Sequence, residues 1–320
     1  MKALENVKWV PRWVAHLGCV KGCLDYLGLE MSEPWLYGGT GHAFVINVHD
    51  ELCPSGPTAW NSMKLFKLGR NLGYRAEGIS ASRDQEDFAA KQKQAYEYAR
   101  QAIDRGYPCY GWELDIPEYY VVHGYDDAGY YFNGPGADDG KGPKPWQELG
   151  DTGIGMLEMY SVTPGEAADD ATTLKAALAF ALEVADSPKD IIFEHYTSGP
   201  AAYDTWIRAL EAGRASDMGT RYNAGVWAEC RRNAVGFLEE AKGRLPGRAD
   251  AAFDQAIAAY RVVAEGLGKV TEIYPWKWEA SDEDLLPIDG DSRAAIEALQ
   301  AAREAERAGL QSLQAIVEAL

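Results

Sequence analysis

The sequence predicts an α+β domain followed by an all-α helical domain, and three observations support this. Residues 1–164 combine short apolar runs and turn signals with many Gly, Tyr and Trp residues, which is typical of mixed helix and strand. Residues 165–320 are rich in Ala, Glu and Leu at helical spacing. Between them, Pro164 interrupts the pattern and Asp169 can cap a new helix. We therefore expect two domains, 1–164 and 165–320.

In the first domain, helices and strands follow one another along the chain, and glycines end the helices. The expected helices are 19–27, 57–73 and 83–106. The expected strands are 42–48, 74–80, 107–114 and 154–162. Residues 118–135 predict a β-hairpin, because two aromatic and β-branched runs flank the turn "DDAG".

In the second domain, helical periodicity dominates and Gly-Pro or Pro-Gly pairs separate the periodic segments. The expected helices are 170–186, 200–213, 220–244, 249–268 and 291–319. A Trp- and Pro-rich stretch, 274–290, separates the last two. No fixed-period repeat or long heptad seam is present, so a bundle of ordinary helices is expected.

Composition excludes several classes of function. The formal net charge is −18 at pH 7, whereas a nucleic-acid surface or an anionic membrane requires clustered Lys and Arg. The longest apolar run, 176–185, is too short to span a bilayer and contains Glu183. The five cysteines do not form a secreted disulfide framework. We therefore expect a cytoplasmic protein that contacts neither membrane nor nucleic acid.

Two stretches of the first domain resemble papain-like cysteine peptidases. They are "CLDYLGLEMSEPWLYGGTGHAF" at 23–44 and "GYPCYGWELDIPEYYVVHGYDDAGYYFNGP" at 106–135. The most similar branches are the bacteriocin-processing peptidase-like domains and the butirosin biosynthesis protein H-type acyltransferases, and the similarity covers about 12–162. It implies an N-terminal helix packed on an antiparallel sheet. The second half is also similar to the helical C-terminal part of the butirosin-type proteins.

The resemblance implies a cysteine at a helix N-terminus, a histidine on a later strand and an Asn or Asp on the next strand. Such a triad works because the helix dipole and an imidazolium stabilise the thiolate. If chain order alone is used, the three roles fall on Cys19, His123 and Asn133.

If the motifs are aligned residue by residue, the three roles fall elsewhere. The family's cysteine then coincides with Ala15, its histidine with Glu118 and its aspartate with Gly134, so that all three roles are vacant. Strand alternation places Glu118 and His123 on opposite faces, so only a β-bulge could bring His123 to the family's position.

In this second alignment Glu118 points into the ancestral cleft. A carboxylate there can bind an amine or guanidinium, or act as a general base. The candidate ligand-binding residues are Glu118, Asp115, Tyr120, His16 and Trp112.

No metal site or cofactor is expected. His42 and His49 are the nearest pair of histidines, but they are seven residues apart on an expected strand and fall on opposite faces. "YGGTGHAF" is Gly-rich but lacks the Lys-Ser/Thr of a phosphate-binding loop.

Three hypotheses about function follow. The first is a protein that binds a small amine- or peptide-like molecule in the cleft between the domains, on a catalytically altered papain-like fold. The second is a cysteine-dependent amide hydrolase or acyltransferase that uses Cys19, His123 and Asn133. The third is a purely structural or interaction protein. Whether the protein is an enzyme, and whether it self-associates, is left open by the sequence.

Overall fold

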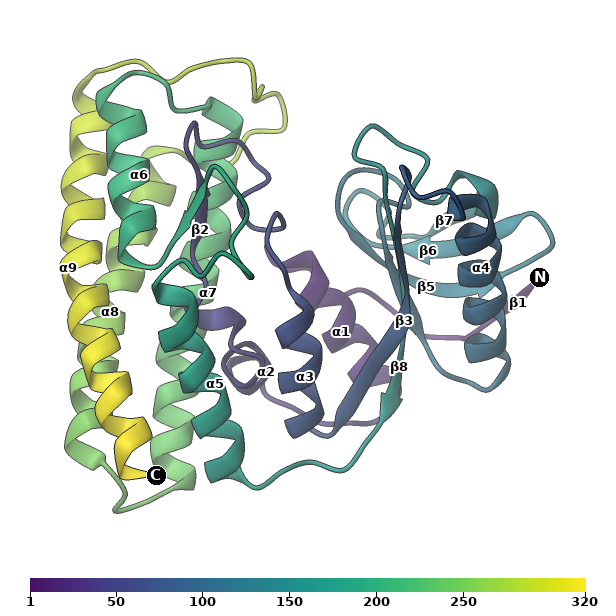
Figure 1. Cartoon of the computed structure of the whole chain (residues 1–320), viewed down its shortest axis with the longest axis horizontal. Helices are drawn as coiled ribbons and strands as arrows, with labels where there is room; N and C mark the ends of the chain where they lie inside the picture. The colour runs from purple at the N-terminus through teal and green to yellow at the C-terminus, as the bar shows by residue number, and fades with distance from the viewer. The chain divides into compact units, whose positions relative to one another are not determined.

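Seven antiparallel strands form the main sheet of this protein in the computed structural model, which describes residues 1–320 (Figure 1). The strands are β1 (Lys2–Ala3), β3 (Tyr74–Ser82), β4 (Cys109–Trp112), β5 (Tyr119–Tyr125), β6 (Gly129–Asn133), β7 (Lys141–Pro145) and β8 (Met156–Pro164). Their order across the sheet is β3-β8-β4-β5-β6-β7, and β1 pairs with β5. The mixed helix and antiparallel-sheet class expected from the sequence is confirmed.

The chain divides into two compact units that differ from the expected domains. The sheet unit comprises Met1–Ser32 and Gly73–Ala167, and the helical unit comprises Glu33–Leu72 and Ala168–Leu320. The expected boundary after residue 164 lies close to the last crossing between units. The expectation was wrong for Glu33–Leu72, because this segment packs with the later helices.

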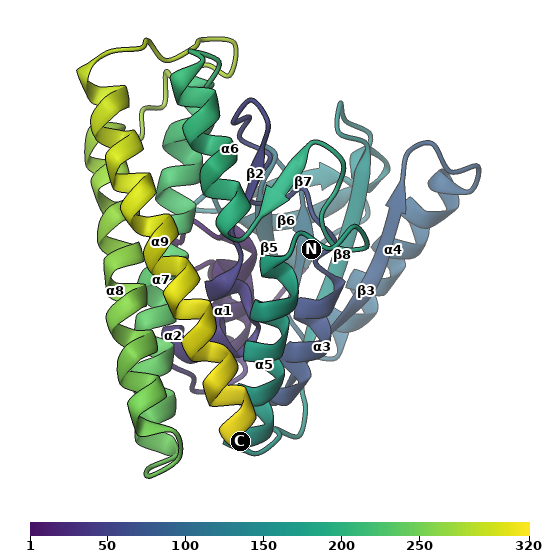
Figure 2. The same cartoon turned by 60° about the vertical axis from the view of Figure 1, so that its left-hand side comes forward.

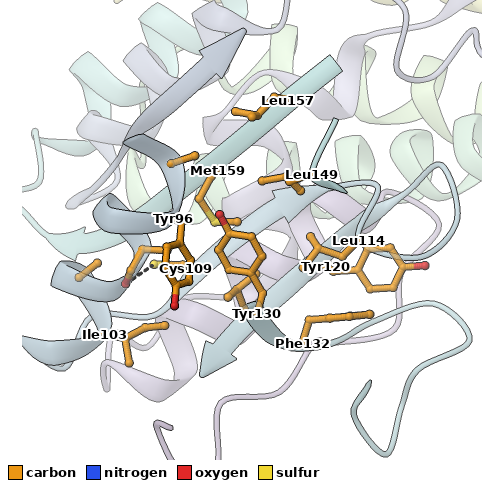
Figure 3. Packing of buried hydrophobic residues seen from close by; sticks show 14 of the residues in the cluster. Tyr96, Ile103, Cys109, Leu114, Tyr120, Tyr130, Phe132, Leu149, Leu157 and Met159 are labelled. Carbon is orange, nitrogen blue, oxygen red and sulfur yellow. Dashed lines mark hydrogen bonds between the residues drawn. The ribbon is translucent and has the colours of Figure 1, made fainter. Parts of the chain in front are cut away.

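Two helices of the sheet unit lie on opposite faces of the sheet, α1 (Ala15–Tyr26) on one and α4 (Phe88–Asp104) on the other (Figure 1). Neighbouring residues of a strand point to opposite faces. Cys109 and Tyr120 belong to the core under α4, which Figure 3 shows, whereas Tyr110 and Tyr119 contact His16 of α1.

The helical unit is built from long helices that pack along one another, and Figure 2 shows α8 and α9 running side by side. Its helices are α2 (Glu33–Gly39), α3 (Met63–Asn71), α5 (Asp170–Ala185), α6 (Pro200–Glu211), α7 (Asp217–Arg244), α8 (Asp250–Ile273) and α9 (Gly290–Ala319). Two short strands, β2 (Asn47–His49) and β9 (Tyr196–Ser198), pair with each other. None of the helices combines the length and apolar character that crossing a bilayer requires.

Contacts between distant parts of the chain hold the first segment of the helical unit in place. The ring of Trp35 on α2 lies 5.1 Å from that of Phe237 on α7. Gly38 lies so close to Phe237 that a β-carbon there would come within 1.9 Å of its ring. These partners are about two hundred positions apart, which is why local patterns did not assign the segment to this unit.

A buried ion pair lies at the centre of the helical unit. Arg231 on α7 donates to Glu306 on α9 through Nε (2.8 Å) and Nη2 (3.1 Å), and both side chains are almost fully buried. Tyr203 and Tyr260 also donate to the Glu306 carboxylate, at 3.0 and 3.3 Å. Nη1 of Arg231 donates to the carbonyl of Val45, so the pair also anchors the segment before β2.

The five helices expected after residue 165 are confirmed, with ends shifted by a few residues. The expected strand 42–48 is largely wrong. Gly41 has a positive φ of 79° and a 3-10 turn, His42–Phe44, follows it, so the paired strand begins only at Asn47. The sequence patterns also missed α2 and β9.

Candidate functional site

The thiol at position 19 does not lie at a helix N-terminus. The first helix begins at Ala15, so Cys19 sits in its second turn, and its side chain is fully buried. Burial raises the pKa of the Cys19 thiol well above its usual value, and the charges of Cys23 and Glu118 raise it further. Both effects favour the neutral thiol, whereas a nucleophile needs the thiolate.

His123 and Asn133 have other partners than Cys19. The pairing of β5 with β6 shifts between Val122 and Gly124, so the strand has an irregularity at His123. His123 is half-buried, which lowers its pKa. The Asn133 side chain accepts from the backbone N–H of Trp9 (2.6 Å) and donates to the Val7 carbonyl (3.1 Å). No hydrogen bond joins any two of Cys19, His123 and Asn133, so the structure does not bring this triad together.

Two of the expected ligand-binding residues hold the 113–118 loop. Tyr120 is fully buried in the core under α4, accepts from the N–H of Ile116 (3.2 Å) and donates to the carbonyl of Pro135 (3.0 Å). Asp115 forms an ion pair with Lys141. Tyr120 is therefore a core residue, and the expectation that it lines a binding surface was wrong. Glu118 is partly exposed and immediately precedes β5.

His16 and Trp112 come together with four residues that the sequence patterns did not indicate. The His16 ring stacks on Tyr119 at 4.8 Å, and its Nε2 lies 3.1 Å from the hydroxyl of Tyr110. The Trp112 ring meets Tyr119 edge-on at 5.0 Å. We call this group, on the α1 side of the sheet, the tyrosine–glutamate cluster, and its members are His16, Tyr110, Trp112, Tyr119, Glu158 and Tyr160.

Cross-strand pairing positions the cluster. Trp112 on β4 lies directly opposite Tyr119 on β5, and Tyr110 on β4 lies directly opposite Tyr160 on β8. Glu158 precedes Tyr160 by two residues and so points to the same face. Directly opposed side chains on one face of an antiparallel pair are close neighbours. The register of three strands thus gathers four aromatic rings and one carboxyl group.

Glu158 is the charged centre of the cluster. The hydroxyl of Tyr119 donates to its Oε2 at 2.5 Å, and Tyr160 hydrogen-bonds to the same carboxyl group. Burial raises the pKa of Glu158, while these two hydrogen bonds lower it. No Lys, Arg or His side chain pairs with Glu158, so the carboxyl group depends on hydroxyl donors alone.

A signal for the missed residues exists in the sequence. "CYGW", "EYYVV" and "LEMYS" each place aromatic or acidic side chains two residues apart, which is the period of one strand face. What these patterns do not specify is which of the two faces carries the site. The sequence prediction named Tyr120, which lies on the core face of β5. Tyr119, the next residue before it, lies on the face that carries the cluster.

The members of the cluster suit hydrogen bonding and the binding of cations. Aromatic faces attract cations, and a carboxylate pairs with them. Nowhere in the chain do three His, Cys, Asp or Glu side chains come together in a way that could hold a metal ion. The sequence matches no protein-family model and no curated protein.

Proposed function

We propose that the sheet unit is a papain-like domain altered at its triad positions, and that its tyrosine–glutamate cluster binds a small amine-bearing molecule. Helix α1 begins at Ala15, the position onto which the resemblance projects the family's cysteine. Glu118 immediately precedes β5 and Gly134 immediately follows β6, so neither lies within the strand on which the resemblance places its histidine or aspartate. The start of α1 at Ala15 supports the alignment in which the catalytic roles are vacant.

The observation that carries the binding proposal is the missing counter-ion of Glu158. Two tyrosine hydroxyls donate to this carboxyl group, but no cation of the chain pairs with it. A partly buried carboxylate without a cation is poorly stabilised, and a ligand ammonium group at hydrogen-bond distance removes this deficit.

Aromatic neighbours define the rest of the proposed ligand. The ring of Tyr119 lies next to Glu158 and Trp112 meets that ring edge-on, and aromatic rings stabilise an ammonium group and its attached carbons. Tyr119 and Glu158 are partly exposed, while Tyr110 is fully buried. The ligand is therefore expected to reach Tyr119 and Glu158 first, and to carry a hydrophobic group next to its amine.

Titration calorimetry with n-butylammonium and benzylammonium, each compared with its uncharged alcohol, tests this proposal. We expect the amines to bind and the alcohols to bind at least about tenfold more weakly, because only the amines supply a cation. Affinity should increase with pH up to and through the pKa of Glu158, since the ionised carboxylate is the binding form. Bound amine should in turn lower that pKa, which ¹³C NMR of the glutamate carboxyl groups measures.

The control compares two neutralising substitutions in the sheet unit. Glu158→Gln should weaken amine binding about tenfold or more, whereas Glu86→Gln, at an exposed position, should leave it unchanged. Equal binding by wild type and Glu158→Gln would refute the proposal. So would equal affinity for the amines and their alcohols.

A further inference from the structure

The two outer strands of the main sheet differ in how they are protected from pairing with a further strand. At one edge, β7 carries Lys141, Pro143, Lys144 and Pro145 within five residues, and lysine and proline both hinder the addition of a strand. At the other edge, β3 pairs only with β8, is nine residues long and contains neither lysine nor proline. The edge of β3 therefore lacks the protection that β7 has.

The register of β3 with β8 determines which backbone groups of β3 face outward. Just beyond the strand, the N–H of Arg83 donates to the carbonyl of its partner Gly155 at 2.8 Å. Hydrogen-bonded residues recur at every second position of an antiparallel pair, so the odd-numbered residues of β3 bond to β8. The N–H and C=O groups of Gly78 and Ser80 consequently point away from β8, and no other group of the chain pairs with them.

Both of these residues are accessible. Gly78 and Ser80 are exposed, and Gly78 has no side chain that would cover the edge. A glycine is required at this position, because a β-carbon would come within 2.0 Å of the carbonyl oxygen of Met159 on β8. Unpaired N–H and C=O groups on an exposed edge strand are a template for a strand from another chain. Gly78 and Ser80 together offer four backbone hydrogen bonds to such a strand.

The open edge leads to the carboxyl group that lacks a cation. Ser80 lies directly opposite Glu158 in the pairing of β3 with β8, so both side chains are on the face that carries the tyrosine–glutamate cluster. The hydroxyl of Ser80 hydrogen-bonds to Tyr160, which in turn hydrogen-bonds to Glu158. Polar side chains therefore connect the outer strand with Glu158.

The spacing of the strands sets the length of a side chain that can reach Glu158 from an added strand. Neighbouring strands lie about 4.8 Å apart, so a strand added to β3 lies about 10 Å from β8. Lysine and arginine carry their charge at the end of a long apolar stem, which can lie across the small side chain of Ser80. We therefore expect the added residue opposite Ser80 to be lysine or arginine.

A second copy of this chain does not provide that cation. Antiparallel pairing of β3 with another β3 through the outward-facing groups places even-numbered residues opposite even-numbered ones. The only cationic residue of β3 is Arg75, at an odd-numbered position, so it would lie on the α4 face of the extended sheet. The charge of Glu158 thus favours a different protein as the partner.

We propose that the free edge of β3 binds an extended segment of a partner protein by strand addition, and that a Lys or Arg side chain opposite Ser80 pairs with Glu158. This inference rests on the proposed function, because it assigns the cation at Glu158 to a side chain of that segment. It adds backbone hydrogen bonds at Gly78 and Ser80, which a small amine does not form.

Titration calorimetry with the blocked peptide acetyl-Thr-Val-Lys-Val-Thr-amide tests the proposal, because the lysine side chain is its only cation. We expect the peptide to bind at least about tenfold more tightly than n-butylammonium, which cannot add as a strand. Replacing the lysine by norleucine should weaken binding at least about tenfold. Methylating the backbone nitrogen of the lysine should have an effect of similar size, since it removes the N–H that pairs with Ser80.

Variants at one position separate the strand edge from the carboxyl group. Ser80→Pro removes an outward-facing N–H and no bond to β8, so the peptide should lose its advantage over n-butylammonium, which should still bind. The matched control Ser80→Ala keeps that N–H and should bind the peptide like wild type. Glu158→Gln should bind the lysine and norleucine peptides equally. Thermal denaturation verifies that each variant is folded.

Amide hydrogen exchange measured by NMR gives a readout on wild type alone. Bound peptide should slow the exchange of the Gly78 and Ser80 N–H groups at least about tenfold. The N–H groups of Glu77 and Ile79 should change little, because they already bond to β8. Unchanged exchange at Gly78 and Ser80 overturns the inference.

The two amine ligands distinguish this inference from the proposed function. If n-butylammonium binds and the lysine peptide binds no more tightly, strand addition is wrong and the proposed function stands. Equal binding of the peptide and its backbone-methylated form has the same meaning. If neither n-butylammonium nor the peptide binds to wild type, both proposals are wrong.

Discussion

The two units of this protein each contain a carboxyl group surrounded by tyrosines, and the two groups differ in their counter-ion. Glu306 in the helical unit receives two hydrogen bonds from Arg231 and one each from Tyr203 and Tyr260. Glu158 in the sheet unit receives hydrogen bonds from Tyr119 and Tyr160 only. A buried carboxylate with a structural role thus forms its ion pair within the chain. A carboxylate that has no cation within the chain is a candidate for binding a ligand.

The largest expected effect comes from breaking the complete pair. Glu306→Gln leaves the guanidinium of Arg231 buried without its counter-ion, and loss of one partner of a buried pair costs about 3–5 kcal/mol. Glu158→Gln removes no pair and should not lower stability at neutral pH. Urea denaturation followed by circular dichroism measures both, and a similar loss in the two variants would contradict the comparison.

A buried histidine of the helical unit gives the next effect. His42 is buried with its Nδ1 3.6 Å from the Sγ of Cys230, and burial lowers its pKa from 6.5 to about 4. The unfolded chain therefore binds a proton at pH values at which the folded chain does not. The free energy of unfolding falls as the pH drops from about 6.5 to about 4. The loss over this range is about 3 kcal/mol.

His42→Gln should flatten this acid dependence, whereas His195→Gln, at an exposed position, should preserve it. Chemical denaturation at pH 7, 6, 5 and 4 provides the measurement. If wild type and His42→Gln lose stability in parallel between pH 6.5 and 4, the neutral buried imidazole is not the cause.

The thiols sharpen the contrast between packing and reactive groups. Cys19 is fully buried with a raised pKa, while Cys53 is partly exposed and its Sγ lies 2.6 Å from the hydroxyl of Ser55. Iodoacetamide at pH 7.5, with mass spectrometry of the peptides, should label Cys53 at least about a hundredfold faster than Cys19. Rapid labelling of Cys19 in the folded protein would instead favour the cysteine-dependent enzyme.

The smallest expected effect is the pH dependence of Glu158 itself. Burial raises its pKa, so its contribution to stability is fully present below the ordinary carboxyl pKa and is lost as the pH rises through the folded value. The stability of Glu158→Gln relative to wild type should therefore rise between pH 4 and pH 7. Thermal denaturation at four pH values in this range tests it, and a constant difference would show that the carboxyl group is not perturbed.

Sequence patterns predicted the later helices well, and predicted the site only in part. Helices such as α5 and α9 are long, periodic and capped, so each is determined by its own residues. The face of β5 that carries the site depends on the preceding loop, where Glu113 has a positive φ of 57° and its N–H donates to the carbonyl of Glu118. No local pattern specifies that turn. The sequence prediction therefore placed the site on the face of β5 that carries Tyr120, and not on the face that carries Tyr119.

The missing counter-ion of Glu158 was also beyond sequence reasoning. Twenty-five per cent of the residues are charged, and nothing in the order of residues shows which cations reach β8.

The discontinuity of the helical unit has a consequence for synthesis of the protein. The segment Glu33–Leu72 leaves the ribosome early, but α7 and β9, against which α2 and β2 pack, are translated much later. Apolar residues of this segment that are fully buried in the finished protein, Leu36 and Ile46 among them, must remain uncovered on the nascent chain until those partners emerge. A fragment that stops at residue 164 keeps them uncovered permanently, and we expect it to aggregate or to require a chaperone.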